Sequence, residues 1–109
     1  MIPKTPLTNL QYPSVNTQTG TAYTITQNDN TNVITCGSGS ATTVTVPVGL
    51  GPGFNCLIVQ IGAGQVTISA ASGVTINNAD SFSAISAQYG AATLFCYAPN
   101  VFYLGGQLA

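Results

Sequence analysis

The chain has almost no ionisable side chains. Its 109 residues include one basic residue, Lys4, and two acidic residues, Asp29 and Asp80, and there is no His, Arg, Glu or Trp. General acid–base catalysis needs a group that titrates near neutral pH, and a nucleophilic cysteine needs a neighbouring base. Two aspartates in separate turns and one lysine near the start of the chain provide neither. We therefore expect no enzyme activity, no cofactor and no small-molecule substrate.

The shortage of charge also limits the binding partners. One lysine cannot neutralise a series of phosphates, so we expect no nucleic-acid binding. The polar turn at residues 27–32 contains a single carboxylate, Asp29. Calcium loops gather several oxygen ligands in a recurring acidic pattern, so we expect no metal site in this turn.

Long apolar runs are absent as well. No segment approaches the ~20 consecutive apolar residues of a membrane helix. Residues 1–6 lack the apolar segment of a signal peptide. We therefore expect no membrane partner.

The chain has few cysteines, and their number and spacing indicate no disulfide or metal-binding motif. Cys36, Cys56 and Cys96 are odd in number, lie in strand-like segments and show no C-x-x-C spacing. We expect three buried, reduced thiols in a protein made in a reducing cytoplasm. The alternative is one disulfide with a single cysteine left over.

Apolar residues make up 45% of the chain, and their spacing is that of β-strands. In residues 66–70, Val and Ile alternate with Thr and Ser, and side chains on a strand point alternately to its two faces. Residues 54–61, which have apolar residues at both parities, and residues 74–76 are also predicted as strands. Between them, the turns contain Gly62, Gly64 and Gly73, and a three-residue hairpin loop commonly ends on a left-handed glycine. The pattern predicts an antiparallel β-meander over residues 54–77, with Gly64 in the left-handed region.

Further short strands are expected along the whole of residues 21–109. No stretch shows the 3.6-residue period of a helix, and turn residues recur at intervals of roughly ten residues. The fold class is therefore all-β, as a small antiparallel β-sandwich, a jelly-roll-like domain or a β-barrel. The remaining strands are predicted at residues 21–26, 33–36, 42–46, 82–88, 91–98 and 101–104.

Residues 1–20 are expected to form an extended N-terminal arm in front of this domain. Proline lacks a backbone donor and has a fixed φ, so a segment with Pro3, Pro6 and Pro13 should not form a paired strand. The scattered apolar residues would be poorly placed in a free tail. We expect the arm to lie on a partner through three anchors, Leu7, Leu10 and Tyr12.

Two predicted strands, residues 54–61 and 91–98, have apolar residues on both faces. A two-layer domain of this size covers only one face of each sheet, so the second face needs a partner or stays exposed. Closed symmetric association is a common way to cover such a face, and low net charge favours it. The expected interface residues in the domain are Leu57, Val59, Ile61, Phe95, Tyr97 and Tyr103.

Three segments together resemble a module of tailed-bacteriophage virion proteins. They are residues 60–77 (QIGAGQVTISAASGVTIN), 88–94 (QYGAATL) and 101–109 (VFYLGGQLA). The module occurs in capsid decoration (cement) proteins, head fibres and tail-fibre segments. The resemblance implies a compact β domain, often trimeric, that acts by binding. Ala87 and Gln107 stand where the family often has a basic residue and an Asp, so ion-pair docking is not carried over.

The resemblance implies a capsid decoration protein on the outer surface of the phage head. Its expected partners are two further copies of itself, as a homotrimer, and the major capsid protein. It would be made in the host bacterial cytoplasm and located on the virion. If the chain is complete, its length suits a surface clamp better than a long fibre. The alternative is a receptor- or glycan-binding module of a head fibre or tail fibre, in which Tyr97 or Tyr103 would contact the ligand.

Overall fold

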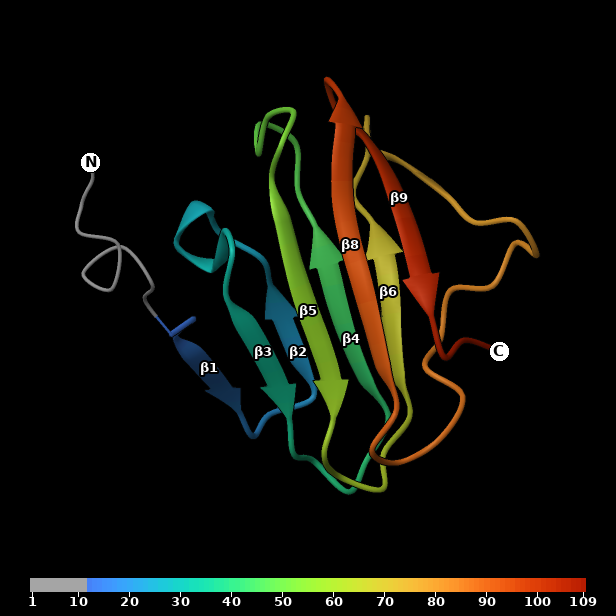
Figure 1. Ribbon diagram of the computed structural model, residues 1–109. Helices are drawn as coiled ribbons and strands as arrows, with labels where there is room; N and C mark the ends of the chain where they lie inside the picture. Colours follow the sequence, from blue (N-terminus) through green and yellow to red (C-terminus); the bar gives the residue numbers. More distant parts are fainter. Residues whose placement is uncertain (1–11) are drawn as a thin grey trace.

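The computed structural model describes residues 12–109, and this part of the chain is all-β, as predicted (Figure 1). It contains a single short 3-10 helix, η1 (Gln27–Asp29). The strands are β1 (Val15–Gln18), β2 (Ala22–Thr24), β3 (Val33–Cys36), β4 (Thr42–Val46), β5 (Asn55–Gln60), β6 (Val66–Ala70), β7 (Thr75–Asn77), β8 (Ala91–Ala98) and β9 (Val101–Gly106).

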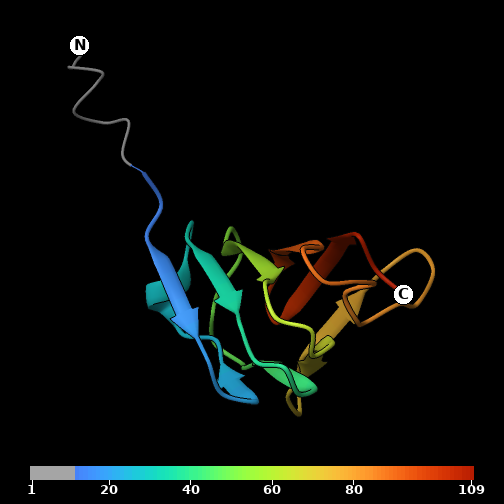
Figure 2. The same cartoon turned by 90° about the horizontal axis from the view of Figure 1, so that it is seen from below.

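The strands form two sheets packed face to face. One sheet has six strands in the order β1-β3-β5-β8-β9-β7, and the other has three in the order β2-β4-β6. From β1 to β6 the chain alternates between the sheets, and every neighbouring pair within these six strands is parallel. Figure 2 shows this winding from below. The first half of the domain therefore has the arrangement of a short β-solenoid rather than of an antiparallel sandwich, jelly roll or barrel.

The predicted meander over residues 54–77 is wrong in its pairing, although its strands exist. β5 pairs with β3 and β8 in the six-stranded sheet, whereas β6 pairs with β4 in the other sheet. The segment between β5 and β6 is a corner that crosses from one layer to the other. Alternation marks a residue as extended but carries no information about which strand is its neighbour.

The glycines of this corner are needed for close packing rather than for a left-handed backbone. Gly62 and Gly64 do not have positive φ, so the predicted left-handed Gly64 is also wrong. A Cβ built on Gly64 would overlap the backbone of Ser40, and one on Gly62 would overlap the backbone of residues 37 and 38. Corners of successive coils thus lie directly on one another, joined by a hydrogen bond of 3.0 Å from Gly64 N to Ser38 O. Gly73 does have a positive φ, +89°, in the turn before β7.

After the coils, the chain completes the six-stranded sheet. β8 is antiparallel to both β5 and β9, and β7 is parallel to β9 at the sheet edge. The strand predicted at residues 82–88 does not form, since this segment makes only isolated bridges, at Ala84 and Ile85. Backbone hydrogen bonds from Ile68 N to Ser83 O and from Ile85 N to Val66 O hold it beside β6. The segment therefore covers the edge of the three-stranded sheet.

The N-terminal segment also differs from its prediction. β1 lies within residues 1–20 and pairs in parallel with β3, with Val15 opposite Val33. The expectation that this segment contains no paired strand is therefore wrong for residues 15–18, which follow the last proline of the segment, Pro13. Of the three predicted anchors, Tyr12 lies among the described residues and is 95% exposed. Leu7 and Leu10 lie outside the described residues.

The core lies between the two sheets. Each strand contributes alternate side chains to it, namely those on the face turned towards the other sheet. In β5 the inward residues are Cys56, Ile58 and Gln60, and all are buried. Gln60 is the polar member, and its Oε1 accepts a 3.0 Å hydrogen bond from Val66 N. The three cysteines are buried and unpaired, as predicted. The apolar core residues are Ile25, Ile34, Cys36, Val44, Val46, Leu50, Phe54, Cys56, Ile58, Val66, Ile68, Ile85, Ala92, Leu94, Cys96, Phe102 and Leu104.

Candidate functional site

The outward surface of the six-stranded sheet, here called the outer face, is the most distinctive surface of the domain. None of the strands in residues 12–109 contains a charged residue, so this face is neutral throughout. Because side chains alternate along a strand, the residues opposite in parity to the core point outward. The outer face is therefore a neutral surface from which apolar and aromatic side chains project.

Strands β1, β3 and β5 carry the aliphatic half of this face, defined as Val15, Val33, Leu57 and Val59. The sheet register places Val15 opposite Val33, and Val33 opposite Leu57. Val59 lies in the next outward position of β5, beside Thr35. Parallel pairing thus joins residues far apart in sequence into one aliphatic patch.

Strands β7, β8 and β9 carry the aromatic half, defined as Phe95, Tyr97, Tyr103 and Asn77. Phe95 lies opposite Tyr103 in the antiparallel pair, and Tyr103 lies opposite Asn77 in the parallel pair. Phe95, Tyr97 and Tyr103 are 40%, 50% and 49% exposed, respectively. Large aromatic side chains that remain this accessible on neighbouring strands are typical of binding surfaces.

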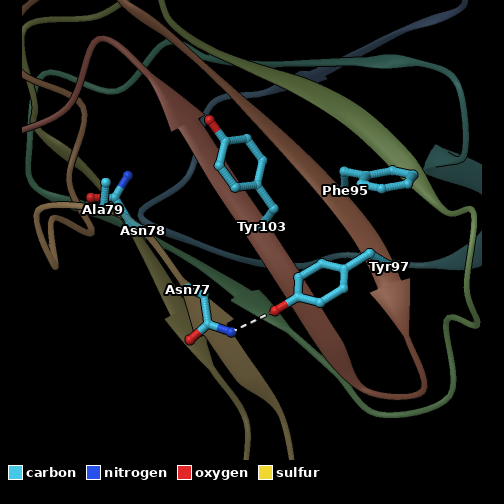
Figure 3. Close-up of a pocket in the computed structure, with 6 residues that line it drawn as sticks. All are labelled: Asn77, Asn78, Ala79, Phe95, Tyr97 and Tyr103. Atoms are coloured by element: carbon cyan, nitrogen blue, oxygen red, sulfur yellow. Dashed lines mark hydrogen bonds between the residues drawn. The ribbon is translucent and has the colours of Figure 1, made fainter.

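These side chains line an open groove of ≈ 540 Å³, here called the aromatic groove (Figure 3). Asn77 Nδ2 donates a hydrogen bond of 2.8 Å to the Tyr97 hydroxyl, which joins one wall to the other. The adjoining loop is held by Asn78, whose Nδ2 donates to Leu104 O at 2.8 Å and whose Oδ1 accepts from Asp80 N at 3.0 Å. The lining residues are Asn77, Asn78, Ala79, Phe95, Tyr97 and Tyr103.

The position of the Tyr103 ring depends on a glycine in the same strand. A Cβ built on Gly105 would overlap the outer end of the Tyr103 ring. The ring therefore lies along β9 over Gly105 instead of standing away from the sheet. Packing an aromatic ring over a strand glycine shields that glycine's backbone from solvent and restricts the ring.

The fold brings most of the predicted interface residues together. Leu57, Val59, Phe95, Tyr97 and Tyr103 all lie on the outer face. Ile61, just beyond the end of β5, is 41% exposed. Their role in an interface stays a prediction.

Sequence reasoning missed other members of this face. Val15 lies in the segment predicted as an arm, and Asn77 and Asn78 lie beyond the strand predicted at residues 74–76. Alternation in residues 33–36 was the signal that could have identified Val33. No sequence signal places Asn77 next to Tyr97, because β7 and β8 are separated in the sheet by β9.

The one buried acidic residue, Asp29, has a structural role in the described chain. Its carboxylate accepts hydrogen bonds from the Tyr23 hydroxyl at 2.6 Å and from Asn16 Nδ2 at 2.9 Å. It also accepts one from Thr26 N at 3.0 Å, which completes the capping box of η1. Burial and the neighbouring Asp29 carboxylate raise the pKa of Tyr23. Asp29 thus ties β1 and β2 to the helix at the first coil.

Residues 12–109 contain no group of three or more His, Cys, Asp or Glu side chains placed to hold a metal ion. No helix in this same part of the chain has the length and apolar character to span a membrane. No protein-family model, curated protein or solved structure matches the sequence or the fold.

Proposed function

We propose that this chain is a structural virion protein, a capsid decoration protein that binds the outer surface of a phage head as a homotrimer. The observation that carries the proposal is the outer face, a contiguous neutral surface of aliphatic and aromatic side chains on one sheet. The resemblance of residues 60–77, 88–94 and 101–109 to phage virion modules supports the same assignment.

Self-association would use the aliphatic half of the face. Leu57 and Val59 project from the centre of the sheet, beside Val33 on the neighbouring strand. Burying apolar surface between copies is favourable by about 25 cal/mol per Å² before the costs of association are subtracted. A neutral surface also imposes no charge repulsion between identical copies.

Binding to the head would stabilise the shell by mass action. A protein that binds the assembled lattice but not dissociated subunits shifts the equilibrium towards the assembled state. The partner in this role is the major capsid protein, and the location is the capsid surface of the virion. Free, buried thiols agree with synthesis in the reducing cytoplasm of a bacterial host.

Analytical ultracentrifugation of the purified chain tests the trimer. We expect a trimer for the wild type and a folded monomer for Leu57→Asp, which introduces a charge in the aliphatic half. Thr43→Asp is the matched control, because Thr43 is an exposed strand residue of the opposite sheet, and it should remain trimeric. A monomeric wild type, or an unchanged trimer in Leu57→Asp, would contradict the proposed interface.

Co-sedimentation with phage heads that lack decoration tests the capsid role. We expect the chain to sediment with expanded heads and to raise their resistance to heat or chelators. If the intact trimer binds no such head, the capsid role is contradicted, although the self-association stands.

The aromatic groove favours a second candidate function, a receptor- or glycan-binding module of a head fibre or tail fibre. In this groove, exposed aromatic rings stand beside amide and hydroxyl groups. Attachment to a lattice does not require such a groove. Specific binding that is lost in Tyr97→Ala, with no binding to heads, would favour this candidate over the decoration protein.

A further inference from the structure

We infer that the aromatic groove binds a neutral sugar ring within an oligosaccharide. This inference deepens the second candidate function and rests on it for its biological setting. It does not require self-association, because the groove lies on β7, β8 and β9, whereas the aliphatic half lies on β1, β3 and β5.

The groove presents exposed aromatic rings. One face of a pyranose ring presents C–H groups, and such an apolar face packs well on an exposed aromatic ring. Phe95 and Tyr103 lie opposite each other on adjacent strands, and Figure 3 shows that the rings are spread along the face rather than closed into a cage. A spread surface suits a flat, extended ligand better than a compact one.

The groove also presents amide and phenol groups that can form hydrogen bonds. Sugar hydroxyls need partners that both donate and accept hydrogen bonds, and amide and phenol groups do so. Asn77 uses one amide hydrogen on the Tyr97 hydroxyl. Within residues 12–109, the Asn77 amide oxygen and the Tyr103 hydroxyl have no hydrogen-bond partner, so both can meet a ligand hydroxyl.

Charged residues are absent from the lining of the groove. Because no acidic or basic residue lines the groove, an anionic sugar or a phosphate would lose hydration without gaining a counter-charge. A cation could approach the ring faces, but the open groove does not surround it, and the only carboxylate of the adjoining loop, Asp80, is not part of the lining. The groove chemistry therefore selects a neutral, hydroxyl-rich ligand.

The groove is already formed in the structure without a ligand. Its volume of ≈ 540 Å³ lies within the range of small-molecule sites, about 300–1,000 Å³. Gly105 leaves room for the Tyr103 ring along the strand, and the Asn77 hydrogen bond holds Tyr97. Side chains restrained before binding lose less conformational entropy when the ligand arrives.

NMR titration of the full chain with cellohexaose and with maltohexaose tests the inference. We expect signals of the groove residues to shift on addition of at least one of them, and an anionic alginate hexamer to leave them unmoved. Tyr97→Ala should weaken the binding by about tenfold or more, whereas Tyr103→Phe should weaken it less because the ring remains. Tyr89→Ala is the matched control, since Tyr89 is 71% exposed and outside the groove, and it should bind as the wild type does.

Several outcomes would overturn the inference. These are no shift with either neutral hexamer up to about 10 mM, equal binding by wild type and Tyr97→Ala, or binding of a cationic chitosan hexamer alone. If Tyr97→Ala fails to fold, Asn77→Ala replaces it as the test variant. Sedimentation of the same samples separates this outcome from the trimer proposal. A variant that loses sugar binding should still self-associate, and a variant that no longer self-associates should still bind the sugar.

Discussion

The ring of Tyr103 lies over Gly105, two positions further along β9, and occupies the space that a side chain on Gly105 would need. This relationship orients the aromatic groove, since Tyr103 is also opposite Phe95 on one side and Asn77 on the other. A glycine in the interior of a strand weakens the strand slightly. Here it allows an aromatic side chain to lie along the sheet.

Gly105→Ala should move the Tyr103 ring while leaving the fold intact. The added methyl overlaps only the outer end of a side chain that can rotate, so we expect a stability loss of about 0.5–1.5 kcal/mol, the range of an aromatic packing contact. The measurement is urea unfolding together with nuclear Overhauser contacts of the Tyr103 ring. Gly39→Ala is the control, because a Cβ there has no neighbour within 4 Å. Ring contacts unchanged in Gly105→Ala would refute the relationship.

Gly64→Ala should be far more damaging than Gly105→Ala. The overlap at Gly64 is with the backbone of Ser40, which cannot rotate away as a side chain can. Overpacking of this kind costs about 1–3 kcal/mol and sometimes more, so we expect a large drop in the urea midpoint or failure to fold. Gly39→Ala again serves as control. A normal midpoint in Gly64→Ala would show that the two corners are not stacked as described.

Ile58→Ala tests the core between the sheets. Ile58 is completely buried on β5, and removing a large buried aliphatic side chain costs about 2–5 kcal/mol. Val48→Ala should cost less than about 0.5 kcal/mol, since Val48 is exposed and surface substitutions are usually small in effect. Equilibrium unfolding of both variants gives the comparison. Similar values for the two would mean that β5 does not face the core at Ile58.

Cys56 should make the domain sensitive to alkaline pH. Burial, helped by the negative charge of Asp29, raises the pKa of its thiol from 9.0 to about 12. The folded state thus holds the proton more tightly than the unfolded state, so this contribution to stability is complete below pH 9 and is lost as the pH rises towards 12. Unfolding free energy measured from pH 8 upward should fall more steeply in the wild type than in Cys56→Ala.

Thiol labelling checks the same residue independently. At pH 8 the folded protein should react with iodoacetamide very slowly, since the thiolate is the reactive form. In urea the reaction should become fast. Rapid labelling of Cys56 in the folded protein would contradict its burial.

Strand positions were largely predictable. Residues 33–36, 42–46, 66–70 and 91–98 form strands with the predicted bounds, because alternation of apolar and polar residues is a local property. Leu57 and Phe95, predicted on the second apolar face of their strands, do point away from the core. Residues 82–88 form no strand, and Ile85 is the only buried side chain among them, so the segment lacks the alternating buried face of a strand.

Strand pairing was not predictable from the same pattern. Gly62 and Gly64 suggested a hairpin loop, since glycine is common both in hairpins and wherever backbones approach closely. The closely approaching backbone is that of residues 37–40, more than twenty positions earlier in the chain. Pro13 likewise suggested an unpaired arm, although β1 begins only two residues later.

The amino-acid sequence by itself determined that this chain is all-β, where most of its strands lie and which of their side chains are apolar, because these properties depend on residues a few positions apart. Only the tertiary structure decided that β1 to β6 wind as parallel coils and that Asn77 meets Tyr97 beside the ring of Tyr103. Backbone hydrogen-bonding groups are chemically alike in every strand, so the choice of neighbour is made by the packing of the whole domain.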